Sequence, residues 1–193
     1  MAKSKNKSNS SGSVRIIGGR WRGRKISFAD LSDLRPTPDR VRETVFNWLQ
    51  ADLGGAHCLD AFAGSGVLGF EAASRGARSV DLVEQDKQAF ALLNATQQQL
   101  QAGECRLFRQ DVRMMLTETS QPYDVVFLDP PYRLQYWQSV AELLEERKLL
   151  QPHSLIYLEY PAGQAVPVLP ENWQMQKSKT AGDVTYCLFA RAA

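Results

Sequence analysis

The chain has 193 residues, of which 44% are hydrophobic and 23% charged, a composition typical of one globular domain. No apolar run approaches the roughly 18 residues of a membrane span. The polar N-terminus lacks the apolar segment of a secretory signal, so we expect a cytoplasmic protein. Three widely spaced cysteines and only two histidines argue against a disulfide framework, a zinc site and chemistry built on a histidine cluster.

Charge is unevenly distributed along the chain. Residues 1–25 contain eight basic residues and no acidic residue, whereas the remaining 15 basic and 21 acidic residues give the rest a net charge of −6. A basic arm on an acidic body indicates a polyanionic partner that is addressed by one end of the molecule. The Ser/Lys/Asn-rich residues 1–13 are predicted to be a disordered basic tail. For residues 1–12 the alternative is a tail that serves only solubility.

The N-terminal part predicts a hairpin followed by a helix. Residues 14–17 and 24–28 are short β-prone runs around a glycine-containing segment. Thr37 is the expected N-cap, and Pro38 the first residue, of a helix whose apolar residues recur on one face and which ends at Gly54.

From residue 57 onward, predicted strands and helices alternate. The expected strands are residues 58–63, 79–84, 105–110, 123–129 and 154–160, the expected helices are residues 67–75, 87–101, 112–118 and 136–150, and residues 173–179 and 184–191 form an antiparallel hairpin. This order predicts an α/β fold with a seven-stranded, mostly parallel sheet. We divide the chain into the tail (1–13), a hairpin-and-helix segment (14–55) and the main domain (56–193).

A glycine-rich loop follows the first strand of this series. Gly64, Gly66 and Gly69 match the pattern G-x-G-x-x-G at a strand end that opens a helix, and Glu84 lies 20 residues after Gly64, where it can accept hydrogen bonds from a ribose. The loop fits NAD, FAD or S-adenosylmethionine, or a tight turn with no ligand. Asp60 opposes a pyrophosphate but suits the cationic end of S-adenosylmethionine.

The second motif is Asp129-Pro130-Pro131-Tyr132, directly after an apolar strand. The prolines remove two amide donors, so the loop presents carbonyl oxygens and a carboxylate as acceptors, and Tyr132 adds a flat ring. Such a loop can hold a planar base by the hydrogens of an exocyclic amino group and aim its nitrogen lone pair at an electrophile. The alternative is a pair of prolines that only ends a strand.

Two further features are less specific. Asp111, after the third strand, can accept a hydrogen bond from an adenine amino group or can cap the next helix. Residues 15–25 interleave basic side chains with Trp21, a pattern that suits phosphates and unpaired bases. The alternative for this segment is a solvated basic hairpin.

Together these motifs resemble S-adenosylmethionine-dependent methyltransferases of the seven-stranded Rossmann-like class. The blocks RIIGGRWRGRKI, LRPTPDRVRETVFNWL, LDAFAGSGVLGFEAASRGA and DPPY are similar to the bacterial 16S ribosomal RNA guanine-N2 methyltransferase family, from about residue 14 to the C-terminus. The resemblance implies methylation of one guanine at N2, in the small subunit or a late assembly intermediate. Neighbouring ribosomal proteins are further possible partners, and no metal or membrane is implied.

The motifs and the resemblance together assign residues to roles. The implied catalytic residues are Asp129, Pro130, Pro131 and Tyr132; the cofactor-binding residues are Asp60, Phe62, Gly64, Ser65, Gly66, Glu84, Gln85, Asp111 and Val112; the RNA-binding residues are Arg15, Arg20, Trp21, Arg22, Arg24, Lys25 and Arg40.

Three other functions remain open at this point. A methyltransferase that acts on DNA or on a protein amide shares the DPPY chemistry, although no separate target-recognition domain is visible. An NAD-dependent oxidoreductase fits G-x-G-x-x-G but leaves DPPY unexplained. The third is a non-catalytic RNA-binding assembly factor, in which the intact DPPY segment and the intact glycine-rich loop would have no catalytic use.

Overall fold

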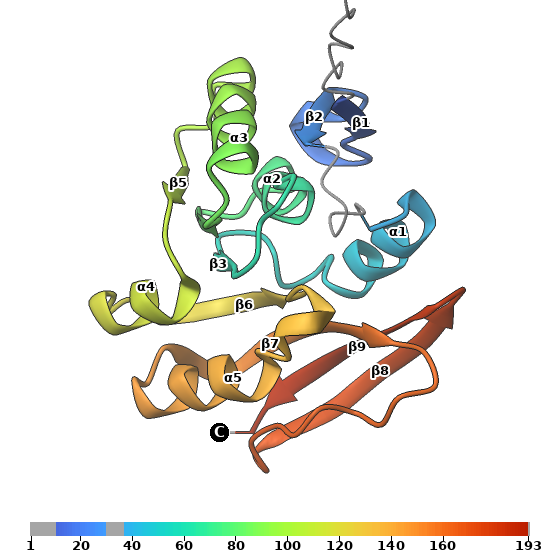
Figure 1. Ribbon diagram of the computed structural model, residues 1–193, viewed down its shortest axis with the longest axis vertical. Coiled ribbons are helices and arrows are strands. Elements are labelled where there is room, and N and C mark those ends of the chain that lie inside the picture. Colours follow the sequence, from blue (N-terminus) through green and yellow to red (C-terminus); the bar gives the residue numbers. More distant parts are fainter. Residues whose placement is uncertain (1–10, 30–36, 193) are drawn as a thin grey trace, which may run out of the picture.

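The computed structural model describes residues 11–29 and 37–192 (Figure 1). The strands are β1 (Ser11–Arg15), β2 (Lys25–Ala29), β3 (His57–Asp60), β4 (Ser79–Val83), β5 (Cys105–Phe108), β6 (Tyr123–Leu128), β7 (Leu150–Pro161), β8 (Trp173–Ala181) and β9 (Val184–Arg191). The helices are α1 (Asp39–Trp48), α2 (Val67–Ser74), α3 (Lys87–Leu100), α4 (Val112–Glu118) and α5 (Trp137–Glu146), with short 3-10 helices η1 (Gly19–Trp21) and η2 (Tyr132–Leu134).

The seven-stranded sheet has the order β5-β4-β3-β6-β7-β9-β8. Strands β3 to β7 run parallel, and β9 is antiparallel to both of its neighbours, β7 and β8. The chain order reverses at β3, because β4 and β5 follow on one side of it and β6 and β7 on the other. Open α/β sheets bind ligands outside the carboxyl ends of the strands at such a reversal. The predicted fold class is confirmed.

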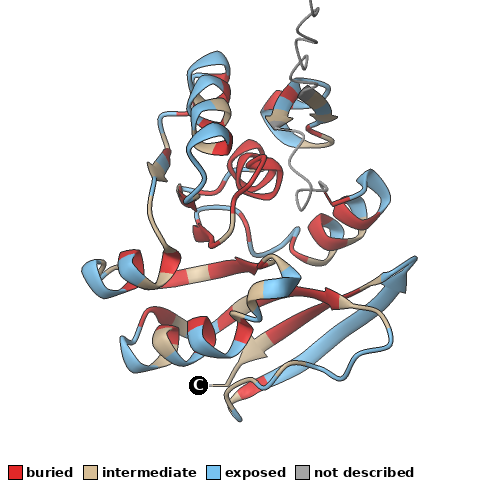
Figure 2. Cartoon of the chain, in the orientation of Figure 1, coloured by how far each residue is buried: buried red, intermediate tan, exposed pale blue. Residues whose placement is uncertain are grey.

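Helices cover both faces of the sheet. Helices α1, α2 and α3 pack on one face, against side chains such as Leu82, Phe127 and Tyr157. Helices α4 and α5 pack on the other face, against Val126 and Leu158. Helix α2 is buried along its whole length and is red throughout in Figure 2. The sheet is therefore the middle layer of three, and the ends of its strands are left uncovered by these helices at the reversal.

The N-terminal hairpin packs on α2 through its 3-10 turn. Trp21 is buried, and its backbone N–H donates to Ser74 Oγ at 2.9 Å. Gly19 has a φ of +70°, and a Cβ at this position would lie 1.9 Å from the backbone oxygen of Ser74. Only glycine permits so close an approach of the turn to the helix.

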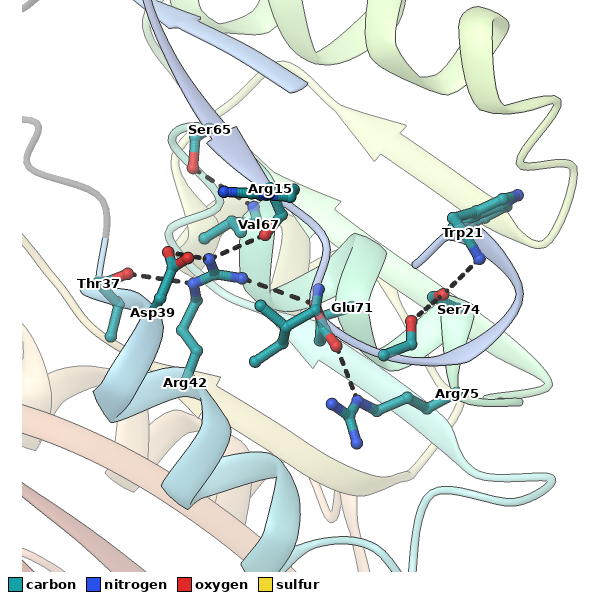
Figure 3. Close-up of polar contacts among 12 residues, drawn as sticks. Arg15, Trp21, Thr37, Asp39, Arg42, Ser65, Val67, Glu71, Ser74 and Arg75 are labelled. Atoms are coloured by element: carbon teal, nitrogen blue, oxygen red, sulfur yellow. Dashed lines mark hydrogen bonds and ion pairs between the residues drawn. The ribbon is translucent and has the colours of Figure 1, made fainter. Parts of the chain in front are cut away.

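One buried arginine joins the hairpin to α1 and α2 (Figure 3). The fully buried guanidinium of Arg42 donates to the backbone oxygens of Thr37 (3.1 Å) and Arg15 (2.9 Å) and to Asp39 Oδ1 (2.6 Å). Its Nη1 lies 3.6 Å from Oε2 of Glu71, a carboxylate of α2 that is also fully buried. Because these groups come from three separate segments, β1, the start of α1 and α2, the hairpin is held in a fixed position on the main domain.

The start of α1 differs from the sequence-based expectation. Pro38 is the N-cap and the helix begins at Asp39, whereas Thr37 was expected to cap it. The hydroxyl of Thr37 donates instead to Oε1 of Glu159, on β7, at 3.0 Å. The hydroxyl that local capping rules assign to the helix end thus takes part in a tertiary hydrogen bond instead.

Two strands are longer than predicted. β7 begins at Leu150, inside the predicted helix 136–150, because Leu150 pairs with Tyr123 of β6. β1 begins at Ser11, within the predicted tail 1–13, because it pairs along its whole length with β2. The predictions made for residues 1–10 lie outside the described residues.

Candidate active site

Four carboxyl groups gather at the carboxyl ends of the parallel strands. Asp60 ends β3, Glu84 follows β4, Asp129 follows β6 and Glu159 lies near the end of β7. Asp60 pairs with Phe127, which pairs with Tyr157, so these three positions face the same side of the sheet. Asp129 and Glu159 lie two residues further along their strands and continue this face. A row of acidic groups therefore crosses the point where the chain order reverses.

Asp60 is a buried carboxyl group without an ion-pair partner among the described residues. Its Oδ2 accepts a hydrogen bond from Gly69 N, in the first turn of α2, at 2.9 Å. Burial, together with the charge of Glu84, raises the pKa of Asp60 to about 7. The ionised form of Asp60 is therefore stabilised by any cation that binds beside it.

The glycine-rich loop approaches Glu84 through its backbone. Gly64 and Gly66 have φ values of +51° and +75°, which favour glycine. Gly64 N donates to Oε2 of Glu84 at 2.9 Å, and Asp86 N donates to Oε1 at 2.7 Å. Burial raises the pKa of Glu84. Each carboxylate oxygen keeps further acceptor capacity, so Glu84 is anchored and still able to accept from a ribose.

Other predicted cofactor residues lie around this loop. Ser65 is buried, and its Oγ accepts from Val67 N at 3.3 Å. The Phe62 ring lies 6.3 Å from that of Tyr136, between centroids. Gln85 is exposed directly after Glu84.

Asp111 has a structural role in the described chain. It is the N-cap of α4 and accepts from Arg113 N at 2.8 Å, and it also pairs with the Arg113 guanidinium at 2.7 Å. The hydrogen bond from Arg113 lowers the pKa of Asp111. Val112, next to it, is buried. The observed contacts of Asp111 are those of a helix cap, which was the alternative interpretation of this residue. The proposed contact of Asp111 and Val112 with an adenine stays a prediction.

The Asp129-Pro130-Pro131-Tyr132 segment turns from β6 into η2. Pro130 is buried, while Tyr132 is 37% exposed and stacks on Trp137, with ring centroids 6.0 Å apart. Burial and the charges of Glu159 and Asp60 raise the pKa of Asp129 well above its usual range. Burial and the charges of Asp129 and Glu159 also raise the pKa of Tyr132. Asp129, Glu159 and Tyr132 are therefore close enough to influence one another electrostatically.

Sequence reasoning missed Glu159. The side chain is buried, and its Oε1 accepts from the hydroxyls of Thr37 and Tyr157. Burial raises the pKa of Glu159. The available signal was an acidic residue within the otherwise apolar strand SLIYLEY, at a position that a buried parallel strand normally fills with an apolar side chain.

The predicted RNA-binding residues separate into two groups. Most of them are exposed on the hairpin or on α1 and are free to meet a polyanion: Arg15, Arg22, Arg24, Lys25 and Arg40. Arg20 pairs with Glu104 and lies 4.1 Å over the Trp21 ring. Trp21 is only 7% exposed and belongs to the core beneath the hairpin, which disfavours stacking on an unpaired base, and this role stays a prediction.

The described part of the chain contains neither a metal cluster nor a helix that could span a membrane. No group of three or more His, Cys, Asp or Glu side chains there is arranged to hold a metal ion. None of the helices in residues 11–29 and 37–192 is long and apolar enough to cross a membrane.

The model of the family described as "Conserved hypothetical protein 95" matches residues 14–190. The chain belongs to this family. It is 43% identical over 183 residues to "Ribosomal RNA small subunit methyltransferase D" of Escherichia coli (strain K12), a match that covers 95% of this chain and 92% of the relative. The protein of the same name from Haemophilus influenzae is 43% identical over 188 residues, with 94% and 95% covered.

Solved structures agree with the family assignment. The yhhF structure of Escherichia coli is 41% identical to this chain, with a TM-score of 0.86. The match covers 94% of this chain and 99% of that one. The SMU.776 structure, which is complexed with SAH, is 14% identical to this chain, with a TM-score of 0.72. The match covers 96% of this chain and 57% of that one, and at this identity it shows the fold alone. The predicted family and the predicted enzyme class, a methyltransferase, are confirmed.

Proposed function

We propose that this protein transfers a methyl group from S-adenosylmethionine to N2 of one guanine in 16S ribosomal RNA, within the small subunit or a late assembly intermediate. One observation carries this proposal. The Asp129-Pro130 acceptors follow β6, and the glycine-rich loop follows the adjacent strand β3, at the reversal of the sheet. The curated relatives are named for methylation of small-subunit ribosomal RNA, and a cytoplasmic location goes with that substrate.

The charges of the site favour S-adenosylmethionine over a dinucleotide. Asp60 is buried beside a second carboxylate, Glu84, and its pKa is raised to about 7. A sulfonium and an ammonium group relieve this repulsion, whereas a pyrophosphate increases it. The loop of Gly64 and Gly66 lets the backbone approach such a ligand closely. An NAD-dependent oxidoreductase is therefore disfavoured.

The acceptor segment supplies the chemistry that an aromatic amine requires. Bound S-adenosylmethionine supplies a methyl group on a sulfonium sulfur, which is an electrophile that needs no metal. Asp129 and the carbonyl of Pro130 accept the two amino hydrogens, so the lone pair of N2 is directed at the methyl carbon. As the N–C bond forms and the C–S bond breaks, N2 loses a proton. The raised pKa of Asp129 suits it to receive that proton.

The basic hairpin is connected to this site by described contacts. The backbone of Arg15, on the hairpin, is bound by Arg42, which also binds the backbone oxygen of Thr37. The hydroxyl of Thr37 then donates to Glu159. Glu159 is one of the four carboxyl groups at the carboxyl ends of the parallel strands, which we call the catalytic edge. We therefore expect a polyanion bound on the exposed arginines of the hairpin to present a flipped base to Asp129.

The decisive experiment maps the methylated nucleoside. The protein is incubated with methyl-labelled S-adenosylmethionine and, separately, with naked 16S rRNA, small subunits or DNA, and the RNA or DNA is digested to nucleosides. We expect label in N2-methylguanosine, with small subunits the best substrate. Label in N6-methyladenine or N4-methylcytosine of DNA, or an absence of label with every substrate, would contradict the proposal.

A further inference from the structure

One carboxyl group at the catalytic edge has no role in the function proposed so far. Glu159 lies on β7 and is only 4% exposed, and no described cation pairs with it. A buried carboxylate is costly unless hydrogen bonds or a ligand compensate it. The neighbouring positions of β7, Leu158 and Tyr160, are buried in the core, so packing of the strand alone does not account for a carboxylate here.

The hydrogen bonds of Glu159 fix the direction of its carboxylate. Both donors, the hydroxyl of Thr37 and the hydroxyl of Tyr157, bind the same oxygen, Oε1. Within the part of the chain that the structure describes, no donor reaches Oε2. The carboxylate is thus held from one side by two hydroxyls and keeps its second oxygen available as an acceptor.

The register of the sheet places Glu159 beside Asp129. Leu128 of β6 pairs with Leu158 of β7, so the next residue of each strand lies at the same level, and neighbouring strands are about 4.8 Å apart. Electrostatics agree with this geometry, since the charge of Glu159 raises the pKa of both Asp129 and Tyr132. Two acceptor groups therefore stand side by side next to the ring that is predicted to stack on the base.

On the basis of the function proposed above, we propose that Glu159 selects guanine by accepting its N1 hydrogen, while Asp129 and the Pro130 carbonyl accept the hydrogens of N2. Among the four RNA bases, only guanine has a ring N–H next to an amino group. In adenine and cytosine the ring nitrogen beside the amino group carries a lone pair, which a carboxylate oxygen repels. A site with unpaired buried acceptors rejects such bases because it leaves those acceptors without donors.

The test changes the base as well as the protein. Small subunits are reconstituted with 16S rRNA that carries, at the mapped nucleotide, either guanine or 2-aminopurine. 2-Aminopurine keeps the N2 amino group but has a lone pair at N1. Single-turnover methylation rates are measured for the wild type, for Glu159→Gln, and for Glu142→Gln as a matched control on the exposed face of α5.

We expect the wild type and Glu142→Gln to methylate guanine at least ~100-fold faster than 2-aminopurine. Glu159→Gln keeps an oxygen for Thr37 and Tyr157 and turns its NH2 group toward the base, so it should be slower on guanine. Its preference for guanine should also fall by at least ~10-fold. The missing O6 of 2-aminopurine affects all three proteins alike and cancels in this comparison.

Two results would overturn the inference. One is a wild type that methylates both bases at similar rates, a measurement that depends on no variant. The other is a Glu159→Gln protein that binds S-adenosylmethionine normally in calorimetry and retains the full preference of the wild type. If wild-type protein forms no N2-methylguanosine in native subunits, the proposed function fails and this inference fails with it.

Discussion

Asp129 and Tyr132 belong to one motif but are expected to contribute in different ways. Asp129→Asn keeps the size of the side chain but presents an NH2 donor to the amino group, so the interaction that strengthens in the transition state is lost. We expect the single-turnover rate on small subunits to fall by several orders of magnitude, with little change in the affinity for S-adenosylmethionine.

The substitutions at Tyr132 are the control for this prediction. Tyr132→Phe keeps the ring, which is stacked on Trp137, and should be mild. Tyr132→Ala removes the ring and should be severe. If Asp129→Asn has a near-normal single-turnover rate while Tyr132→Phe is strongly slowed, the prediction is contradicted, and the phenol oxygen of Tyr132 rather than Asp129 is the acceptor.

Asp60 predicts how cofactor affinity depends on pH. Its pKa of about 7 means that the carboxyl group becomes protonated as the pH falls below 7, and it then no longer attracts a cation. We expect the affinity for S-adenosylmethionine, measured by calorimetry, to fall by up to about tenfold per pH unit between pH 7 and 5. Asp60→Asn should bind weakly with a flatter profile, whereas Glu142→Gln should follow the wild type. An unchanged slope in Asp60→Asn would remove Asp60 from the cofactor site.

At the scale of the elements, the hairpin is expected to bind phosphates through its exposed cations. Replacement of Arg22, Arg24 and Lys25 by Ala should weaken binding to small subunits. It should also reduce the slope of log affinity against log salt by about 2 to 3, since each lost phosphate contact removes somewhat less than one unit. Cofactor affinity should not change, because these side chains are exposed outside the sheet.

A matched variant makes this prediction specific to the hairpin. Lys148, Lys177 and Lys179 are exposed elsewhere on the molecule, and their replacement by Ala removes the same number of charges. If this variant loses as much affinity as the hairpin variant, net charge rather than the hairpin governs binding.

The Arg42 cluster should dominate the stability of the N-terminal segment. Arg42→Met leaves the backbone oxygens of Arg15 and Thr37 without their donor and removes one of the two cations near Glu71, which keeps Arg75 at 2.8 Å. We expect a loss of about 3 kcal/mol in the free energy of unfolding, measured with urea. Arg42→Lys should recover only part of it, because an ammonium group lacks the planar fork. A loss below ~1 kcal/mol would contradict this account.

Local sequence patterns predicted the elements well but not the contacts between distant segments. Alternation of apolar strands with helices was sufficient to predict the elements and the glycine loop, because these depend mostly on residues that are neighbours in the sequence. The hydroxyl of Thr37 and the start of β7 at Leu150 depend on partners far away in the sequence. Trp21 and Glu159 show the same limit, because whether a ring or a carboxylate is buried is decided by the elements that pack over it.

At the scale of the whole molecule, the acidic site should make the free protein less stable at higher pH. The pKa values of Asp60, Glu84, Asp129 and Glu159 are raised by burial, so the folded state binds more protons than the unfolded state between about pH 4 and 7. Stability contributed by these groups is present at the acidic end of this window and is lost as the pH rises.

Thermal unfolding between pH 5 and 8 tests this expectation. The melting temperature of the free protein should fall toward pH 8, and saturating S-adenosylmethionine should raise it more at pH 8 than at pH 5. Asp60→Asn should flatten the profile of the free protein. Asp111 and Glu145 have lowered pKa values, so their contribution to stability increases rather than decreases with pH. This increase occurs at more acidic pH than the tested range, because their pKa values lie below the usual carboxyl range. A melting temperature that rises steadily from pH 5 to 8 would contradict the prediction.

The contacts of Arg42 and Thr37 bear on how such an enzyme can acquire new targets. Where a recognition domain is joined to a catalytic domain by a linker, each can be exchanged without disturbing the other. Here the segment that carries the basic hairpin also supplies a hydrogen-bond donor to Glu159, inside the catalytic edge. Replacement of that segment would therefore alter the chemistry along with the targeting. Divergence to another RNA is expected to proceed by substitutions on the outer surface of the hairpin, with its inner contacts retained.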